Sequence, residues 1–553
     1  MAFSAKTRTA SIEKMTEKEL DLLIIGGGIT GVGTALDAAT RGMNVGLIEM
    51  QDFAAGTSSR STKLIHGGLR YLKQFEIKLV AEVGTERAVV YENAPHVTTP
   101  LRMMLPFYKG GTFNSLTTSI GLSVYDRLAG VKKAERRTMM RAKEAITKEP
   151  ILAEEGLRGA GMYVEYRTDD ARLTIEVAKT AAEKGALLTN YVKAESFVYD
   201  DKKVVGVVAK DLVTGEGMTI RAKKIVNATG PWVDTLREQD RSKEGKTIHL
   251  TKGVHLVLSK KRLPLNQALY FDTPFKDGRM MFAIPRGEKV YIGTTDTNYQ
   301  GDMSEPGVTK EDVTYIIDAA NGLFPGYNLS EADVESSWSG LRPLIHEEGK
   351  DPSDISRKDE IFHSKSGLMT IAGGKLTGYR KMADSIVTTV AKELEADGGQ
   401  VYGPCKTKQL VLSGGDVGGS DQLDFFNAAH VEAGKQLGLD EKTATALVER
   451  YGSNVPQVFA FLEDDQAEQF GLPKAVWASL RYAMAYEMAL TPVDFLLRRS
   501  AYMLFDIEVA KAYKDNVVEA MASILNWSNE ERTNHEKELD KQWRLVTLSD
   551  VLK

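Results

Sequence analysis

Asp21-Leu22-Leu23-Ile24-Ile25-Gly26-Gly27-Gly28-Ile29-Thr30-Gly31 is the stretch that decides the fold of this 553-residue chain. Its apolar run, residues 21–25, is typical of a buried parallel strand. The glycines that follow have the spacing G-x-G-x-x-G. The first permits a tight turn, the second a close approach of backbone to a pyrophosphate, and the third the packing of a helix on the strand. We therefore predict that residues 26–31, with Gly27, Ile29 and Thr30 among them, bind a dinucleotide.

The residues after this turn complete a strand–helix–strand unit. Residues 30–41 are rich in small side chains, which predicts a helix lying close on a sheet with its N-terminus toward the phosphates. Residues 44–48 predict the second strand, and Glu49 ends it. A carboxylate there can accept hydrogen bonds from both ribose hydroxyls and would repel a 2′-phosphate, which disfavours NADP. A glycine-rich turn without a ligand is the plainer alternative, but the acid at the expected distance favours the dinucleotide.

A second unusual stretch, Gly56-Thr-Ser-Ser-Arg-Ser-Thr-Lys-Leu-Ile-His-Gly-Gly-Leu-Arg-Tyr-Leu72, follows closely. It mixes Ser and Thr hydroxyls, basic residues and a glycine pair with apolar residues. A surface loop would not need the apolar residues, and a core helix would not tolerate Gly67-Gly68 cheaply. We predict a polar segment packed inside the protein against an anionic ligand, which it shares with residues 26–31.

The choice between FAD and NAD rests on this segment and on Ala228-Thr229-Gly230. The triplet ends a predicted strand that begins at Ile225, about 200 residues after the glycine-rich turn, where two-domain flavin oxidoreductases return to the nucleotide domain. A plain exit from a strand is the alternative for the triplet alone. Together with Glu49 it favours FAD as the cofactor.

The composition and charge of the chain exclude or disfavour several classes of protein. The net charge of −5 and pI of about 6.0 disfavour a nucleic-acid partner. Cys405 is the single cysteine, so no intramolecular disulfide and no cysteine-cluster metal site can form, and we predict no metal. Residues 1–20 have no apolar core of signal-peptide length, and no run of 18 apolar residues predicts a membrane span. Peripheral membrane attachment stays open.

The order of elements predicts an α/β fold in which a Rossmann-like FAD-binding domain is interleaved with an antiparallel-sheet substrate domain. Strands are predicted at 254–258, 280–284 and 290–294, and a helix after the N-cap Thr309. The glycine-rich stretch 413–420 predicts a linker, and the helical spacing beyond it an all-helical C-terminal domain. The predicted boundaries are 18–100, 155–235 and 360–395 for the FAD domain, 101–154 and 236–359 for the substrate or cap domain, and 421–553 for the helical domain.

Several long motifs resemble those of FAD-dependent glycerol-3-phosphate dehydrogenases, and the bacterial respiratory type is the most similar. The motifs occur in family order over residues 20–395. They are residues 56–72, Thr168-Asp-Asp-Ala-Arg-Leu173, Lys252-Gly-Val-His-Leu256, Asp277-Gly-Arg279, Ile292-Gly-Thr-Thr-Asp296, Gly340-Leu-Arg-Pro-Leu344 and Gly373-Gly-Lys-Leu-Thr-Gly-Tyr-Arg380.

The resemblance implies oxidation of sn-glycerol 3-phosphate to dihydroxyacetone phosphate in glycerol catabolism. Hydride would pass from carbon 2 to the flavin N5, and the electrons onward to a quinone. It also implies a cytoplasmic protein with peripheral contact at the inner face of the cell membrane, and it leaves a homo-oligomer open. Cofactor contacts beyond the first turn are then expected from Glu49, Ser58, Ser59, Thr62, Lys63, His66, Gly67, Gly68, Ala228, Thr229, Gly230, Gly374 and Thr377.

The substrate needs cations for its phosphate and a base for its hydroxyl proton. The resemblance offers Arg70, Tyr71, Arg279 and Arg357 for binding, and His255, Arg342 and Lys375 for catalysis. His255 is the first choice as base because a neutral imidazole suits proton transfer near pH 7, although a hydrogen-bonded histidine of a sheet is the plainer alternative. Arg342 could stabilise an alkoxide, and Lys375 the reduced flavin.

Other functions share parts of this pattern. A glycerol-3-phosphate oxidase would use oxygen and make peroxide, but it would be expected to carry an insertion that this chain lacks. An amine or amino-acid oxidoreductase would need one carboxylate-binding arginine rather than several. A flavin-containing tRNA-modifying protein is disfavoured by the acidic net charge.

Overall fold

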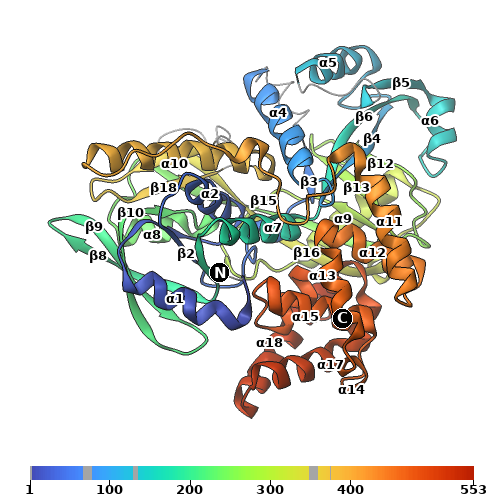
Figure 1. Ribbon diagram of the computed structural model, residues 1–553. Helices are drawn as coiled ribbons and strands as arrows, with labels where there is room; N and C mark the ends of the chain where they lie inside the picture. Colours follow the sequence, from blue (N-terminus) through green and yellow to red (C-terminus); the bar gives the residue numbers. More distant parts are fainter. Residues whose placement is uncertain (1–2, 67–76, 129–134, 348–358, 374, 553) are drawn as a thin grey trace.

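The computed structural model describes residues 3–66, 77–128, 135–347, 359–373 and 375–552, and it is built around two sheets and a helical C-terminal region (Figure 1). The first sheet has the order β17-β18-β10-β1-β2-β7. Its strands are β17 (Glu360–His363), β18 (Met369–Ala372), β10 (Gly217–Asn227), β1 (Leu20–Ile25), β2 (Val45–Ile48) and β7 (Leu187–Thr189). The hairpin β8 (Val192–Asp200) and β9 (Lys203–Asp211) extends it beside β10. β10, β1 and β2 run parallel, which confirms the strands predicted on either side of the glycine-rich turn.

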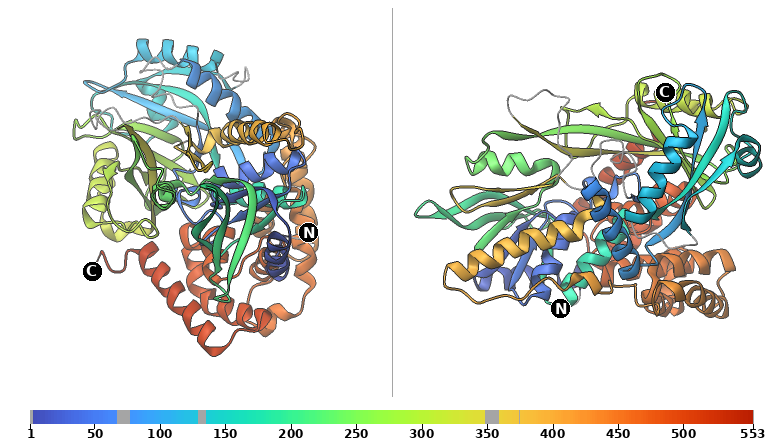
Figure 2. Two further views of the ribbon diagram at one scale, coloured as in Figure 1. Left: turned by 90° about the vertical axis from the view of Figure 1, so that its left-hand side faces the viewer. Right: turned by 90° about the horizontal axis from the view of Figure 1, so that it is seen from above.

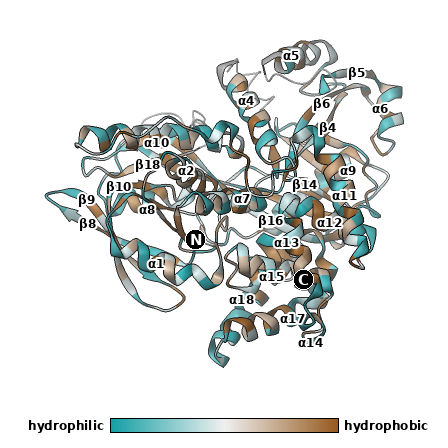
Figure 3. Ribbon diagram, viewed as in Figure 1, coloured by the Kyte–Doolittle hydropathy of each residue, from teal (hydrophilic) through white to brown (hydrophobic). Residues whose placement is uncertain are grey.

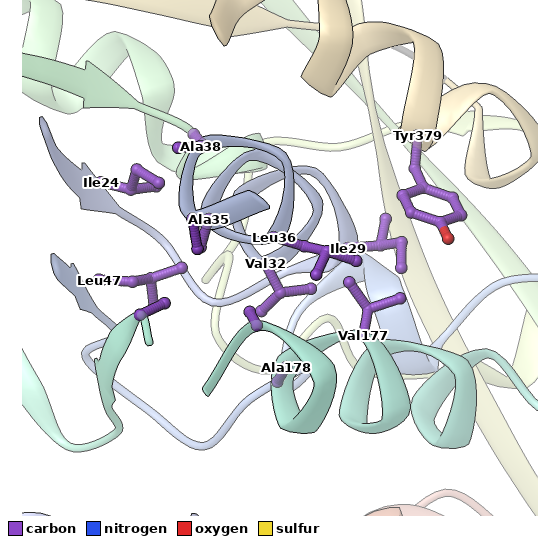
Figure 4. Packing of buried hydrophobic residues seen from close by; sticks show 14 of the residues in the cluster. Ile24, Ile29, Val32, Ala35, Leu36, Ala38, Leu47, Val177, Ala178 and Tyr379 are labelled. Carbon is purple, nitrogen blue, oxygen red and sulfur yellow. The ribbon is translucent and has the colours of Figure 1, made fainter. Parts of the chain in front are cut away.

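The helix predicted after this turn is α2 (Ile29–Thr40), which lies between α7 (Asp170–Glu183) and α10 (Tyr379–Ala396). Small side chains let it approach both neighbours. Val32 and Leu36 of α2 pack with Val177 of α7 and Tyr379 of α10 in the core next to β1 (Figure 4). On another side of the sheet, α1 (Arg8–Glu17) places the buried Met15 against Gly46 of β2. β2 is therefore buried at every position and β1 at every position except Asp21, as their apolar sequences predicted.

The second sheet is mostly antiparallel and has the order β15-β11-β14-β13-β12-β4-β6-β3. Its strands are β15 (Thr297–Asn298), β11 (Lys246–Ser259), β14 (Lys289–Gly293), β13 (Met280–Arg286), β12 (Ala268–Asp272), β4 (Thr98–Tyr108), β6 (Leu157–Thr168) and β3 (Leu64–Ile65); β16 (Val334–Glu347) pairs with β11, and β5 (Thr138–Arg141) with β6. The predicted strands at 254–258, 280–284 and 290–294 lie in β11, β13 and β14. The capping box of Thr309 and Asp312 begins α9 (Lys310–Leu323) as predicted.

The predicted boundary at residue 155 does not follow the sheets. β6 lies in the second sheet because it pairs with β4 from Thr168 back to Leu157, and the chain joins the nucleotide layer only from α7 onward. The short strand β3 also leaves the nucleotide layer to pair with β6. The segment between β4 and β6 forms a lobe with α5 (Ser115–Leu128) and α6 (Ala142–Lys148), which lies beyond α4 (Ile77–Asn93) at one end of the molecule (Figure 1).

Residues 423–547 form only helices, as predicted for this region. They are α11 (Leu423–Gln436), α12 (Glu441–Tyr451), α13 (Val455–Phe459), α14 (Gln466–Gln469), α15 (Lys474–Tyr486), the π-helix η12 (Asp494–Arg499), α16 (Tyr502–Phe505), α17 (Ile507–Leu525) and α18 (Asn529–Thr547), joined by short 3-10 turns. Thr491 and Pro492 lead into the π-helix rather than into an α-helix. The region packs against the second sheet, with Phe505 beside Trp338 and Tyr291.

The α5 lobe lies at the top and the last helices, α17 and α18, at the bottom of the molecule in Figure 1 and in the left view of Figure 2. Outer helices such as α10 carry both hydrophilic and hydrophobic residues, as expected of helices with one face on a core (Figure 3). Among the described residues, no helix combines the length and the apolar character needed to cross a membrane.

Candidate active site

The turn from β1 into α2 is shaped by glycines whose replacement the backbone would not permit. Gly26 has φ +115°, and a Cβ there would lie 2.6 Å from the carbonyl oxygen of Ala228. A Cβ on Gly31 would clash with the carbonyl oxygen of Gly26. The end of β10, Ala228-Thr229-Gly230, therefore lies directly against the turn. This contact brings the two predicted cofactor motifs together.

The N-terminus of α2 opens toward a cavity. Gly28 is the N-cap and offers no capping side chain, while the backbone N–H of Ile29 donates to Ser58 Oγ at 2.9 Å. Helix N–H groups at such a terminus favour anions. Ser58 belongs to the second motif, so the two motifs share one wall of the cavity.

Glu49 lies at the end of β2, beside the turn. Its carboxylate accepts hydrogen bonds from the backbone N–H groups of Gly27 at 2.6 Å and Gln51 at 2.7 Å. Burial raises the pKa of Glu49, and these two hydrogen bonds oppose the shift. The carboxylate is thus fixed at the cavity wall, where its remaining lone pairs can accept ribose hydroxyls.

The cavity at this turn has a volume of about 490 Å³ and fits FAD in its chemistry. One end has the donors of the α2 terminus and the acceptor Glu49. From there the cavity runs past Gly56 and Trp232 to Lys375 and Leu376. The predicted contacts that line it are Gly26, Gly28, Ile29, Thr30, Glu49, Ser58, Ala228, Thr229 and Gly230. A phosphate-binding turn, a ribose acceptor and a long arm toward the second sheet match the parts of a flavin dinucleotide.

A smaller cavity of about 160 Å³ adjoins the first. Thr57, Ser61, Lys375 and Leu376 line both cavities, so their side chains lie at the junction. His255 of β11 and Arg342 of β16 face the smaller cavity. Sequence reasoning placed these two on separate motifs, and the pairing of β11 with β16 brings them to one wall.

His255 is 1% exposed and stacks on Trp338, with ring centroids 4.7 Å apart and planes 9° apart. Its Nε2 lies 3.1 Å from Thr62 Oγ1, and its Nδ1 has no hydrogen-bond partner among the described residues. Burial, then Arg342 and Lys63, hold the pKa of His255 well below its usual range. The imidazole is therefore neutral, as a proton acceptor must be.

Arg342 and Arg279 converge on Asp296. Arg342 donates to the Asp296 carboxylate at 3.1 Å and to Thr294 Oγ1 at 3.0 Å, whereas Arg279 donates to the Asp296 carbonyl at 3.3 Å. Arg342 lines the smaller cavity. The Arg279 side chain is 40% exposed and lies outside the lining of that cavity, over the Tyr315 ring.

The structure places two predicted cofactor contacts, Lys63 and Ser59, outside the lining of the large cavity. Lys63 is 2% exposed and donates to the Asp170 carboxylate at 2.6 Å and to the Ser59 carbonyl at 3.0 Å. Neither Lys63 nor Ser59 lines the large cavity. Asp170 also accepts hydrogen bonds from the N–H and hydroxyl of Ser61. An unpaired ammonium could not be buried so fully, so Lys63 depends on Asp170. The pair holds the segment 59–63 by contacts inside the protein.

Three other predicted cofactor contacts, Thr62, His66 and Thr377, line the smaller cavity instead. Thr377 Oγ1 donates to the His66 carbonyl at 3.2 Å. Burial, and then the Lys375 ammonium, lower the pKa of His66 to about 4. Gly67, Gly68, Arg70, Tyr71, Arg357 and Gly374 lie outside the described residues.

Sequence reasoning missed Arg60, Ser304 and Trp338. Arg60 lines the smaller cavity and donates to the Ser304 carbonyl at 3.0 Å, and Ser304 in turn lines the large cavity. The position of Arg60 inside the motif 56–72 was a usable signal. Trp338 donates from Nε1 to the Ser61 carbonyl beneath His255, and no local pattern marks it.

Asp37, Asp384 and Cys405 bring three potential metal ligands within 4.8 Å of one another. Arg41 already pairs with both carboxylates, since its Nη2 lies 2.5 Å from Asp37 and 3.1 Å from Asp384. None of these three residues lines either cavity.

Comparison with known proteins places these features in a family. The FAD dependent oxidoreductase family model matches residues 21–380, and the model of the C-terminal domain of alpha-glycerophosphate oxidase matches residues 405–532. The aerobic glycerol-3-phosphate dehydrogenase of Bacillus subtilis is 58% identical over 98% of this chain and 97% of its own length. That of a Staphylococcus aureus strain is 56% identical over 96% and 95%.

Among solved structures, the glycerol-3-phosphate dehydrogenase of Bacillus halodurans, complexed with FAD, is 48% identical with a TM-score of 0.85, over 99% of this chain and 98% of that one. The FAD-bound L-alpha-glycerophosphate oxidase of Mycoplasma pneumoniae, 16% identical with a TM-score of 0.55 over 71% of this chain and 98% of that one, shares the fold. FAD is thus the cofactor of this chain, and the large cavity is the candidate site for it.

Proposed function

Because the chain belongs to the FAD-dependent glycerol-3-phosphate dehydrogenase family, we propose that it oxidises sn-glycerol 3-phosphate to dihydroxyacetone phosphate and passes the electrons to a quinone, as a step of glycerol catabolism. One observation supports the substrate more than any other. A small cavity with a buried neutral imidazole and a guanidinium adjoins the cofactor cavity. Its volume of about 160 Å³ suits a three-carbon alcohol.

FAD, when bound, supplies the acceptor for the hydride that leaves carbon 2. The chain must supply the remaining requirements of the reaction. It has to hold the substrate against the cofactor, accept the proton of the hydroxyl group, and exclude water. Thr57, Ser61 and Lys375 at the junction of the cavities are the side chains placed to hold the reacting carbon against the cofactor.

His255 is the group we assign to the hydroxyl proton. In the structure without substrate, its pKa is held down first by burial and then by the charge of Arg342. A substrate phosphate or developing alkoxide beside Arg342 would offset that positive charge and raise the pKa of His255. The base would thereby become stronger only when the substrate is present. Thr62, hydrogen-bonded to Nε2, fixes the ring and could pass the proton.

Arg342 and Arg279 are the described candidates for the phosphate, with Arg70, Tyr71 and Arg357 proposed beside them. Planar guanidinium groups bind phosphate with two parallel hydrogen bonds. Arg342 lies at the cavity wall and Arg279 on the exposed side of Asp296, which both contact. Lys375 adds a cation at the junction, where negative charge accumulates during the reaction.

A quinone acceptor implies contact with a membrane, and α5 offers a surface suited to it. Ile120 is 60% exposed and Val124, one turn further, is 39% exposed, whereas Leu122 points inward and is buried. The exposed Arg136 follows the helix in the same lobe. Apolar side chains beside basic ones are typical of helices that lie in the membrane interface. We propose that this lobe rests on the inner face of the cell membrane.

The substrate is tested by anaerobic titration of the purified flavoprotein. Adding sn-glycerol 3-phosphate should bleach the visible flavin spectrum, whereas glycerol, glycine and proline should leave it unchanged. A spectrum that stays oxidised with glycerol 3-phosphate would refute the substrate, and bleaching by an amino acid would support the amine-oxidoreductase alternative.

The acceptor is tested on the reduced protein. A short-chain quinone should restore the spectrum much faster than air does. Rapid peroxide formation on admitting oxygen would instead support the oxidase alternative.

The membrane surface is tested by co-sedimentation with anionic lipid vesicles. The wild type should sediment with the vesicles, and the double variant Ile120→Glu, Val124→Glu should not. Equal sedimentation of both proteins would contradict the proposed surface.

A further inference from the structure

Asp52 lies in the loop that carries the ribose acceptor, three residues after Glu49, yet it does not line the cofactor cavity. The loop is tied to the glycine-rich turn at two points. Glu49 accepts the Gly27 N–H, and the Ala54 N–H donates to the Gly27 carbonyl at 3.1 Å. Met50, Gln51, Ala55 and Gly56 of the same loop line the cavity. Any shift of this loop therefore moves a wall of the FAD site.

The side chain of Asp52 is held by the helical region, more than 400 residues away in sequence. Its carboxylate accepts hydrogen bonds from Arg498 Nε at 2.6 Å and from Arg499 Nη1 and Nη2 at 2.7 and 2.8 Å. Asn190 Nδ2 donates to it at 3.0 Å. Asp52 is 1% exposed, and the two arginines are 7% and 2% exposed. Burial alone would raise the pKa of Asp52, but Arg499 and Arg498 lower it to about 2.

The two arginines are fixed in turn by the π-helix η12 and its surroundings. Arg499 donates to the carbonyl of Glu487, and Arg498 Nη2 donates to Asp494 at 2.7 Å. Asp494 also accepts the hydroxyl of Tyr191 at 2.6 Å. The backbone N–H of Tyr191 returns to the FAD loop, because it donates to the Gln51 carbonyl at 2.9 Å. Two separate routes thus connect η12 with the loop 49–56.

Such a network is costly to bury unless every charge is paired. A surface contact would have been sufficient to dock a helical region on a sheet, and the apolar contacts around Phe505 already do so. A bidentate guanidinium–carboxylate contact adds a defined geometry. Its placement directly behind the cofactor loop, rather than elsewhere on the interface, indicates that the loop is what it positions.

We propose that Asp52 is a positioning residue for FAD and that Arg498 and Arg499 make the C-terminal helical region part of the cofactor site. The proposal concerns cofactor affinity, so it does not depend on which alcohol is oxidised or which acceptor is used. It predicts that FAD binding and the docking of η12 are thermodynamically coupled.

The test compares Asp52→Asn with Asp312→Asn in the full chain. Asp312 forms a similarly buried ion pair, with Lys252 Nζ at 2.6 Å, and neither partner lines the FAD cavity. FAD affinity is measured by flavin fluorescence during titration of the apoprotein, and stability by thermal unfolding of the same apoprotein. Asp52→Asn should weaken FAD binding on the order of ten- to a hundredfold, as is typical when a residue that orients a ligand-contacting group is lost. Asp312→Asn should lower the unfolding temperature with FAD affinity unchanged within about twofold.

Equal FAD affinity of Asp52→Asn and wild type would overturn the proposal. So would an equal loss in both variants, because that would show only a general loss of stability. If Asp52→Asn does not fold, Arg499→Lys serves in its place, since it keeps the charge and removes the bidentate geometry. It should weaken FAD binding while the apoprotein stays folded, and unchanged affinity would again overturn the proposal. Asp52→Glu should restore part of the affinity.

Discussion

The glycine-rich turn 26–31 and the loop 49–63 form two walls of one cofactor cavity, but they are held in different ways. The turn is fixed by close backbone contacts, such as the carbonyl oxygens of Gly26 and Ala228 that lie against its glycines. The loop is fixed by buried charges from distant parts of the chain: Arg498 and Arg499 hold Asp52, and Asp170 holds Lys63.

This difference has a physical consequence. Steric contacts at a glycine do not depend on the solvent or on charge, so the turn should fail only when a side chain is added. Buried ion pairs depend on both partners, and removing one leaves the other charged in a medium of low dielectric constant. Substitutions far from the cavity should therefore disturb the loop more than they disturb the turn.

The largest effect on FAD binding is expected from Gly31→Val. Its Cβ would clash with the Gly26 carbonyl, which is backbone and cannot rotate away. Overpacking of about 1–3 kcal/mol or more corresponds to about a five- to 150-fold or greater loss of FAD affinity. The flavin content of the purified protein measures it. Gly121→Ala is the control, because a Cβ at Gly121 meets no atom within 4 Å. Full flavin content in Gly31→Val would show that the turn is less rigid than its contacts indicate.

Lys63→Met tests the other wall. It removes one partner of a buried pair and leaves Asp170 charged, which should cost about 3–5 kcal/mol of unfolding free energy. Denaturant unfolding of the apoprotein measures this cost, and Asp170→Asn in the same chain should recover part of it. If Lys63 contacted the cofactor instead, as its motif suggested, FAD affinity would fall while the stability of the apoprotein stayed the same.

Arg342→Gln addresses the chemistry between the two walls. It removes the guanidinium beside His255, so we expect kcat/KM for glycerol 3-phosphate to fall about 10²- to 10³-fold. The visible spectrum should remain that of a normal flavoprotein. Arg279→Gln is the matched control, because its side chain lies outside the lining of the small cavity, and it should act mainly on KM. Equal losses of kcat in the two variants would contradict the assignment of Arg342 to the reacting end.

The smallest effect is a pH dependence of the unfolding free energy that comes from His96, where residues 414 and 452 pack against the end of α4. His96 is 6% exposed, and Gly414 and Gly452 lie against its ring. Burial, then Arg172 and Lys179, lower the pKa of His96 to about 3. The stability that its neutral form contributes is present above pH 6.5 and is lost as the pH falls, by about 1.4 kcal/mol per pH unit at most. Between pH 6.5 and 5, His96→Asn should unfold with a flatter pH dependence than wild type, and an equal slope would contradict the lowered pKa.

The same division explains what the sequence could predict. The turn 26–31, Glu49 and the end of β10 were predictable because local spacing encodes strand, turn and helix. His255 and Arg342 were predictable as residues of motifs, but not as neighbours, since the pairing of β11 with β16 is long-range. The inward orientation of Lys63 follows from Asp170, and the role of Asp52 from Arg498 and Arg499. No local sequence pattern around Lys63 or Asp52 predicts these partners.

Hydrogen–deuterium exchange of the full chain with and without FAD tests the central claim, that distant charges hold one wall of the cofactor cavity. If FAD binding and the buried network are coupled, FAD should slow exchange in residues 49–63 and also in Asp494–Arg499 of η12. Exchange in α11, Leu423–Gln436, which packs on α12 in the same helical region, should not change. Protection confined to residues around the turn, with η12 unaffected, would contradict the account.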